Sequence, residues 1–297
     1  MTLALCGASD PEESIPMKTW LLMLSTALHL IATAVDAATI VNCTGENDSP
    51  ALQAALDAPR ASVLVSGDCR LTQPLFIAAW DVTLRGESSA TLLYDGPGYA
   101  MTIWGPQRTL VRDVAVWSNA GGVFVGGGAI NTRFQAVRVN AYGGDAFTLG
   151  EGSGFWLNNQ SHLNGTPGLG TRGVRVNGPW DTGVISDVVV EEHDSCLRLG
   201  GEHGAVVAFT IVNLVCDRLR GVALHIEPTG TGSVYSIQAS NVLTTRGIAP
   251  VFINAARTTG YIGLVILSNW SVHAATIPAV WVDGPVGEVS TSQILYR

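Results

Sequence analysis

Two arginines and a histidine recur at matched places in the sequence, and they are the first candidates for chemistry. Arg175, Arg198 and His225 each stand in the middle of an apolar triplet, and Phe252 and Trp281 take the same place in the next two triplets. A guanidinium pairs with carboxylates through parallel hydrogen bonds, and an aromatic ring offers an apolar platform to a sugar face. An imidazole exchanges a proton near neutral pH. These residue types together predict a site for an acidic sugar chain.

Carboxylates and one more arginine stand just before these triplets. Asp145 and Arg172 lie four residues before the end of their triplets, and Asp194 is adjacent to the same position in the next one. If successive triplets stack about 4.8 Å apart, Asp145 and Asp194 are roughly 9–10 Å apart, near the upper limit of about 9.5 Å for an inverting glycosidase. We expect Arg172, between them, to hold both carboxylates ionised. The alternative is that both aspartates only form corner turns.

A lyase would use the cations instead. An arginine would neutralise the carboxylate of a uronate residue, and His225 or an arginine would remove the neighbouring proton. Glu227 follows the His225 triplet, and His203 is expected near the same edge. The alternative is that Glu227, Asp194 or Glu202 only compensates the arginines, which would make this a solvated charged face.

The triplets themselves predict how these side chains are positioned. Each begins after a small or Gly-rich corner, alternates inward and outward residues, and ends in a polar or Gly-rich turn. Their last residues are spaced 22 to 29 positions apart and are Ile103, Val125, Leu149, Val176, Leu199, Ile226, Ile253 and Val282. A repeat of this length with period-2 alternation predicts stacked coils of β-strands.

A second series of strands runs out of phase with the first. Its strand ends are predicted at Val116, Val139, His162, Val190, Cys216, Val242 and Val272, and many of these strands follow a polar corner: Asp113, Asn159, Asp187, Asn213 and Asn269. This register makes His162 a core or corner histidine. Because one coil cannot bury its own apolar face, the coils must stack. We predict an all-β protein, a single-stranded right-handed parallel β-helix of about eight or nine coils.

The N-terminal part of the chain predicts a leader and a cap. Residues 1–37 are expected to be an extension and a signal peptide, with translation starting at Met17 and cleavage near Ala37; a retained anchor is the alternative. Residues 38–297 would form the β-helix domain. Ser49–Ala58 predicts a short capping helix after Ser49 or Asp48.

Cysteine spacing predicts how an exported chain would be crosslinked. Cys43 and Cys69 flank the predicted helix and form a candidate disulfide. Cys196 and Cys216 are either a second bridge or two ordinary buried thiols. The cysteine spacings match no zinc motif, and no acidic cluster suited to calcium is seen. No metal and no cofactor is therefore expected.

Several segments of residues 40–297 resemble one superfamily. Asp48–Leu56, Val63–Gly67 and Val82–Gly86 are similar to the N-terminal part of the pectin-lyase-like superfamily, which includes polygalacturonases, pectate lyases and phage tailspikes. The resemblance implies a right-handed helix with a polysaccharide along one outer face. Of the polygalacturonase motifs, Asp194-Ser195-Cys196 resembles D-D-C without its second carboxylate, and Glu202-His203-Gly204 resembles G-H-G but follows too soon.

The chain is therefore expected to be a secreted protein, extracellular or periplasmic, acting on a uronate-containing polysaccharide as a lyase or hydrolase. The alternative is a non-catalytic carbohydrate binder, adhesin or virion tail appendage. A net charge of −8 argues against a nucleic-acid partner, no stable membrane span is expected after signal removal, and the open end of the coil predicts homo-oligomers. The candidate catalytic residues are Asp194, His225, Arg198 and Asp145, and the candidate binding residues are Arg175, Arg172, Glu227, His203, Phe252 and Trp281.

Overall fold

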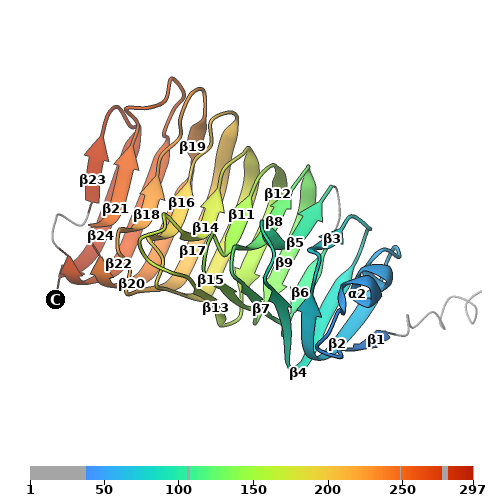
Figure 1. The fold of residues 1–297 in the computed structure, drawn as a ribbon. Helices are drawn as coiled ribbons and strands as arrows, with labels where there is room; N and C mark the ends of the chain where they lie inside the picture. Colours follow the sequence, from blue (N-terminus) through green and yellow to red (C-terminus); the bar gives the residue numbers. More distant parts are fainter. Residues whose placement is uncertain (1–37, 106–107, 248, 276–279, 297) are drawn as a thin grey trace, which may run out of the picture. The chain divides into compact units, whose positions relative to one another are not determined.

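The computed structural model describes residues 38–105, 108–247, 249–275 and 280–296, so the predicted signal peptide lies outside the described residues. The described chain is a parallel β-solenoid of about nine turns with one short helix near its start (Figure 1). Two sheets run along it, one of nine strands and one of fifteen. Every paired strand in both sheets is parallel to its neighbour, as the stacking of coils requires.

The nine-stranded sheet contains every predicted triplet. Its strands are β3 (Leu75–Ile77), β5 (Tyr99–Trp104), β8 (Gly121–Gly126), β11 (Phe147–Leu149), β14 (Arg172–Val176), β16 (Ser195–Leu199), β18 (Val222–Ile226), β21 (Ala249–Asn254) and β23 (Val280–Asp283). The register pairs triplet with triplet without a shift from β5 to β23. The predicted column of middle residues is therefore real, and β3 extends it to Phe76.

The fifteen-stranded sheet contains the second predicted series. Its strands are β1 (Thr39–Asn42), β2 (Ser62–Leu71), β4 (Thr83–Tyr94), β6 (Leu110–Arg112), β7 (Ala115–Ser118), β9 (Ala129–Gln135), β10 (Arg138–Ala141), β12 (Gly152–Asn158), β13 (Ser161–Asn164), β15 (Trp180–Glu191), β17 (Ala205–Asp217), β19 (Ser233–Tyr235), β20 (Ile237–Gly247), β22 (Leu264–Ala275) and β24 (Glu288–Tyr296).

The predicted polar corners are left-handed residues that bend this sheet. Asp113, Asn159, Asp187, Asn213 and Asn269 have φ values of 53 to 61°, a conformation that Asn and Asp tolerate better than other non-glycine residues. The corner side chains also bond from rung to rung. Asn213 donates to Asp187 over 2.8 Å, Asn241 donates to Asn213 over 3.1 Å, and Asn269 donates to Asn241 over 3.1 Å.

The predicted register of the second series is wrong in two coils. Val139 pairs with Leu163, and Leu163 pairs with Val190, so Leu163 and not His162 faces the core. His162 points outward and lies 3.1 Å from the Glu191 carboxylate, because a shift of one residue turns a side chain to the other face. Thr244, not Val242, lies between Cys216 and Val272.

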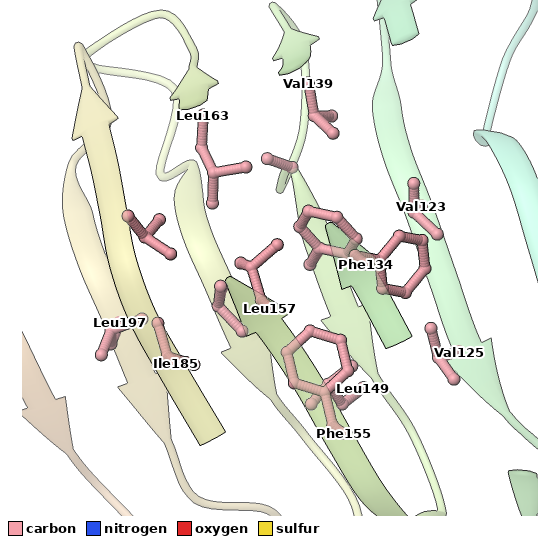
Figure 2. Packing of buried hydrophobic residues seen from close by; sticks show 14 of the residues in the cluster. Val123, Val125, Phe134, Val139, Leu149, Phe155, Leu157, Leu163, Ile185 and Leu197 are labelled. Carbon is pink, nitrogen blue, oxygen red and sulfur yellow. The ribbon is translucent and has the colours of Figure 1, made fainter. Parts of the chain in front are cut away.

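Apolar side chains from both sheets fill the interior of the coil (Figure 2). Phe134 from the fifteen-stranded sheet packs edge-on against Phe147 from the other, with ring centroids 4.7 Å apart. Leu149 and Leu157 are fully buried, as the inward positions of the alternation require. The core is therefore continuous from coil to coil, which fixes the spacing of the outward residues.

Helix α2 (Ser49–Leu56) covers the N-terminal end with Leu52 and Leu56, both fully buried. It ends two residues earlier than predicted, ahead of Pro59. Asp48 is its N-cap residue, and its backbone carbonyl accepts the Leu52 N–H, but its side chain does not cap the helix. The Asp48 carboxylate accepts the backbone N–H groups of Thr44, Gly45 and Arg70 instead. The predicted Cys43–Cys69 disulfide forms beside the helix, and Cys196 and Cys216 form a second bridge in the core.

Candidate functional site

The register of the nine-stranded sheet places the cationic side chains on consecutive strands. Arg175 on β14 pairs with Arg198 on β16, and Arg198 pairs with His225 on β18. Phe252 and Trp281 follow on β21 and β23. All five are middle residues of their triplets, so they point away from the core on one outer face.

Glu227, just beyond the end of β18, is the centre of this cluster. It is only 7% exposed, and its Oε2 lies 2.6 Å from Arg198 Nη2 and 3.5 Å from His225 Nε2. Its Oε1 accepts Asn254 Nδ2 over 3.3 Å and lies 3.4 Å from Arg257 Nη1. A carboxylate this buried needs such partners to remain charged, so Glu227 joins three coils into one polar network.

His225 is a neutral imidazole within this network. Burial lowers its pKa to about 4; Glu227 raises it, and Arg198 and Arg172 lower it further. Its Nε2 is buried, lies 3.5 Å from Glu227 Oε2 and has no hydrogen-bond partner among the described residues. A neutral imidazole keeps one unprotonated ring nitrogen, which can accept a proton at neutral pH.

Asp145 is a second buried carboxyl, three strands away from Glu227. It accepts the backbone N–H of Arg172 over 2.8 Å and lies 3.5 Å from Arg172 Nη1 and 3.8 Å from Arg175 Nη1. Burial raises its pKa, although Arg172 and Arg175 oppose the rise. Only 7% of the residue is exposed, so desolvation outweighs the pairing with Arg172 that we expected to hold this carboxyl ionised.

Two hydroxyls link Asp145 to a ring that the sequence did not single out. Thr148 Oγ1 donates to Asp145 over 3.3 Å, and Tyr99 Oη donates to Thr148 over 3.0 Å. Tyr99 and Thr148 are 49 positions apart in the chain. The polar network around Asp145 thus extends from β14 across to β5.

Asp194 holds a loop. Its carboxylate accepts the backbone N–H groups of Gly168 over 2.8 Å and Thr171 over 3.0 Å, and also that of Gly170. Because Asp145 and Asp194 bond the consecutive N–H groups of residues 172 and 171, the two carboxyls lie less than about 10 Å apart. The neighbouring His193 is fully buried, and its Nδ1 lies 3.1 Å from Thr171 Oγ1. Burial lowers the pKa of His193 to about 4, with Asp194 opposing.

Two cavities open on this face and meet at Arg175, which lines both. One, of about 430 Å³, is also lined by Arg198, Glu227, Glu202 and His203. The other, of about 370 Å³, is lined by Tyr99, Asp145, Leu169 and Arg172. His203 also lies 3.3 Å from the Thr231 hydroxyl. Six predicted residues line one or both of these cavities: Asp145, Arg172, Arg175, Arg198, Glu227 and His203. Four others line neither: Asp194, His225, Phe252 and Trp281.

Aromatic rings lie on both sides of the charged rungs. Towards the N-terminus, Phe124 lies 6.0 Å from Trp104 and 5.4 Å from Tyr99. Towards the C-terminus, Phe252 lies 5.1 Å from His225 and 5.4 Å from Trp281. These pairs form apolar platforms at each end of the cationic patch.

Sequence reasoning missed several members of this cluster. Tyr99 lies outside the predicted triplets, and Arg257 lies in the turn that follows one. Asn254 carried a readable signal, since it follows its triplet as Glu227 follows the His225 triplet. Asn177 follows the Arg175 triplet in the same way and accepts Arg175 Nη2 over 3.0 Å. Polar residues one position beyond the triplets therefore form a second column from which members of the site can be predicted.

Within the described residues, no group of three or more His, Cys, Asp or Glu side chains is placed to hold a metal ion. No helix among those residues has the length and apolar character needed to span a membrane.

No protein-family model and no curated protein matches the sequence. In structure, the chain is similar to an endo-xylogalacturonan hydrolase from Aspergillus tubingensis, with a TM-score of 0.62 and 12% identity, covering 88% of this chain and 93% of that one. It is similar to PfbA, a surface adhesin of Streptococcus pneumoniae, with a TM-score of 0.55 and 9% identity, covering 82% and 81%.

It is also similar to a tailspike protein of E. coli bacteriophage HK620, with a TM-score of 0.55 and 11% identity, covering 86% of this chain and 59% of the tailspike. At these identities the likeness is one of fold, which does not fix function. A hydrolase, an adhesin and a tailspike share this scaffold. By its fold, then, the chain is a parallel β-helix like these three proteins.

Proposed function

We propose that the chain binds a uronate-containing polysaccharide along the outer face of the nine-stranded sheet and cleaves it. The observation that carries this proposal is the cavity lined by both Arg175 and Arg198, in a chain whose net charge is −8. Two arginines on neighbouring rungs repel each other. Glu227, 2.6 Å from Arg198, and Asp145, 3.8 Å from Arg175, offset part of that repulsion, and an anionic ligand between the arginines relieves the rest. The aromatic platforms on either side suit the apolar faces of sugar rings.

The first candidate chemistry is β-elimination. Arg175 and Arg198 neutralise a uronate carboxylate, which acidifies the C5 hydrogen. His225 takes that proton on a ring nitrogen. The C4–oxygen bond breaks, its electron pair leaves with the oxygen, which takes a proton from water, and C4 and C5 become double-bonded. Glu227, 3.5 Å from Nε2, stabilises the imidazolium that forms. The neutral state of His225 at neutral pH supports its role as the base.

The second candidate chemistry is hydrolysis, and the raised pKa of Asp145 favours it. A protonated Asp145 could donate to the leaving oxygen while Asp194 activates water. Their separation of less than about 10 Å is compatible with the ~6.5–9.5 Å of inverting enzymes. The likeness to a hydrolase supports this alternative at the level of the scaffold.

The test is incubation of the purified chain with polygalacturonate, xylogalacturonan and alginate. Absorbance from an unsaturated product means elimination, new reducing ends alone mean hydrolysis, and retention without turnover means a binder, as an adhesin would be. We expect Arg198→Met to weaken polymer binding about tenfold or more, since charge-assisted hydrogen bonds contribute about 1.5–3 kcal/mol. Arg246→Met, at an exposed position of β20, is the matched control. Equal binding by both variants would place the site elsewhere.

We further propose that residues 1–37 direct export, which would bring the chain to its extracellular or periplasmic substrate. The two disulfides of the described chain support an oxidising compartment. N-terminal sequencing of protein recovered outside the producing cell should begin near Ala38. Protein that stays membrane-bound with an intact N-terminus would instead mean a retained anchor.

A further inference from the structure

A separate hollow of about 840 Å³ lies on the fifteen-stranded sheet, over the first coils. It is lined by outward residues of β2, β4, β7, β10 and β13 and by the corners between them. None of these residues lines the two cavities beside Arg175. The hollow is therefore a different surface of the solenoid from the candidate site.

The hollow exists because one outward column changes from small to large residues. Thr91 pairs with Ala115, Ala115 with Arg138, and Arg138 with His162. The outward side chains are therefore short on the first two rungs and long on the next two. Gly86 also lines the hollow, and a Cβ atom there would collide with the Asp113 carbonyl oxygen.

A shift in register lies close to Gly86. Ser66 pairs with Glu87, but Asp68 pairs with Thr91, so β4 contains two more residues than β2 between these pairs. An insertion of this kind bends the strand away from its partner and re-aims its side chains. Glu87 thereby stands on the rim of the hollow.

The rim combines an open aromatic ring with a free cation. Trp117 is 42% exposed and stands edge-on to Tyr142, with centroids 6.4 Å apart. Arg138 is exposed and forms no ion pair with any described residue, whereas Arg85 lies 3.9 Å from Asp113. His162 is already 3.1 Å from Glu191. An indole face suits a pyranose ring, and a free guanidinium suits a carboxylate.

We propose that this hollow is a second saccharide-binding site, which holds a uronate-containing segment through Trp117 and Arg138 without cleaving it. Glu87 and Gln160 on the rim offer hydrogen-bond partners to sugar hydroxyls. The choice of a uronate ligand rests on the proposed function, whereas the site itself does not. Two sites on one rigid solenoid would raise the avidity for a polymer without changing the chemistry on a short oligomer.

The experiment compares retention on immobilised polygalacturonate, xylogalacturonan and alginate with turnover of soluble tetramers of galacturonate, mannuronate and guluronate. We expect Trp117→Ala and Arg138→Met each to weaken polymer retention about tenfold, because a stacked ring or a charged hydrogen bond contributes roughly this much. Tetramer turnover should stay within twofold of the unmodified chain. Trp80→Ala, another exposed tryptophan at 52%, and Arg246→Met are the controls.

Arg175→Met separates this inference from the proposed function. In that background we expect tetramer turnover to be lost and a weak polymer retention to remain, which Trp117→Ala then abolishes. Unchanged retention in Trp117→Ala and Arg138→Met overturns the second site, whatever happens at Arg175. Unchanged turnover in Arg175→Met overturns the proposed function alone. Failure of the unmodified chain to be retained on any of the three polymers overturns both.

Discussion

The imidazole of His225 lies between Arg198 on one neighbouring strand and the ring of Phe252 on the other, whose centroid is 5.1 Å away. Arg198 repels a positive charge on this ring. Only Glu227 favours the imidazolium, and burial outweighs that attraction. The same balance operates on Asp145, where burial outweighs two arginines. Both groups are held in their neutral forms over a wider pH range than in water.

If His225 is the base of an elimination, the acid limb of kcat/KM should reflect its lowered pKa. The base must be neutral in the free enzyme, so activity should persist as pH falls below 6.5 and decline only near pH 4. The measurement is kcat/KM from pH 3.5 to 8 for the unmodified chain. A limb near pH 6.5 would contradict the role, as would an unchanged profile in His225→Gln.

Glu227→Gln should destabilise the fold more than the loss of a surface charge does. Arg198 is 20% exposed in its side chain and pairs with Glu227 over 2.6 Å, so neutralising Glu227 leaves a largely buried cation uncompensated. The expected loss is about 2–4 kcal/mol in the free energy of unfolding. The measurement is urea denaturation monitored by tryptophan fluorescence.

Glu192→Gln is the matched control, because Glu192 pairs with Arg218 over the same 2.6 Å but both side chains are more than a third exposed. An exposed pair contributes about 1 kcal/mol or less. Equal losses in the two variants would show that the Glu227 network does not stabilise the site.

At the scale of elements, the loop of residues 165–171 depends on a residue outside itself. Asp194 precedes β16 and bonds three backbone N–H groups of that loop. Leu169, 63% exposed at the loop, lines the same cavity as Asp145 and Arg172. Asp194 thus fixes one wall of the candidate site whether or not it also acts on substrate.

Asp194→Asn should therefore loosen the loop, because an amide replaces charged acceptors and presents a donor to one of the N–H groups. We expect faster proteolytic cleavage within 165–171 and weaker polymer binding, with the rest of the solenoid intact by circular dichroism. Asp181→Asn, at an exposed position of β15, is the control. Lost turnover with an unchanged cleavage rate in the loop would instead mark Asp194 as a catalytic group.

The nine-stranded sheet could be predicted because its apolar triplets recur regularly along the sequence. Each triplet from Met101 to Val282 has two inward apolar residues around one outward residue, so register follows from spacing alone. The second series failed at His162 because Asn158 to His162 are all polar and carry no alternation to fix the register. There Ser161 faces inward with Leu163, and its hydroxyl bonds the Asn158 carbonyl over 2.7 Å.

The column of site residues followed from the same period, but its electrostatics did not. Spacing places Arg172 beside Asp145, yet the raised pKa depends on how deeply the carboxyl is buried. The bond from Tyr99 to Thr148 depends on the reach of a tyrosine side chain across the rungs. Side-chain length and desolvation are set by packing in three dimensions, which a one-dimensional repeat does not encode.

At the scale of the whole solenoid, the two ends of the described chain differ in how their apolar residues are covered. Helix α2 covers the first coil, whereas the last coil leaves Val282 40% exposed and Leu295 54% exposed. Within the described strands, β23 pairs only with β21, and β24 only with β22. Uncovered apolar residues beside unpaired strand edges favour association with another chain. This is the physical basis for the predicted homo-oligomer.

We expect residues 38–297 to associate reversibly, with a sedimentation coefficient that rises with protein concentration at micromolar levels. The double variant Leu295→Lys with Val282→Lys should be monomeric, because the free energy needed to desolvate two lysines exceeds the stabilisation from the contact. Ile130→Lys, at a 40% exposed position on β9 away from this end, should leave association unchanged. If the unmodified chain sediments as a monomer at all concentrations, or the double variant associates equally well, the open end is not an interface between copies. Association lost in Ile130→Lys as well would place the contact on the side of the solenoid.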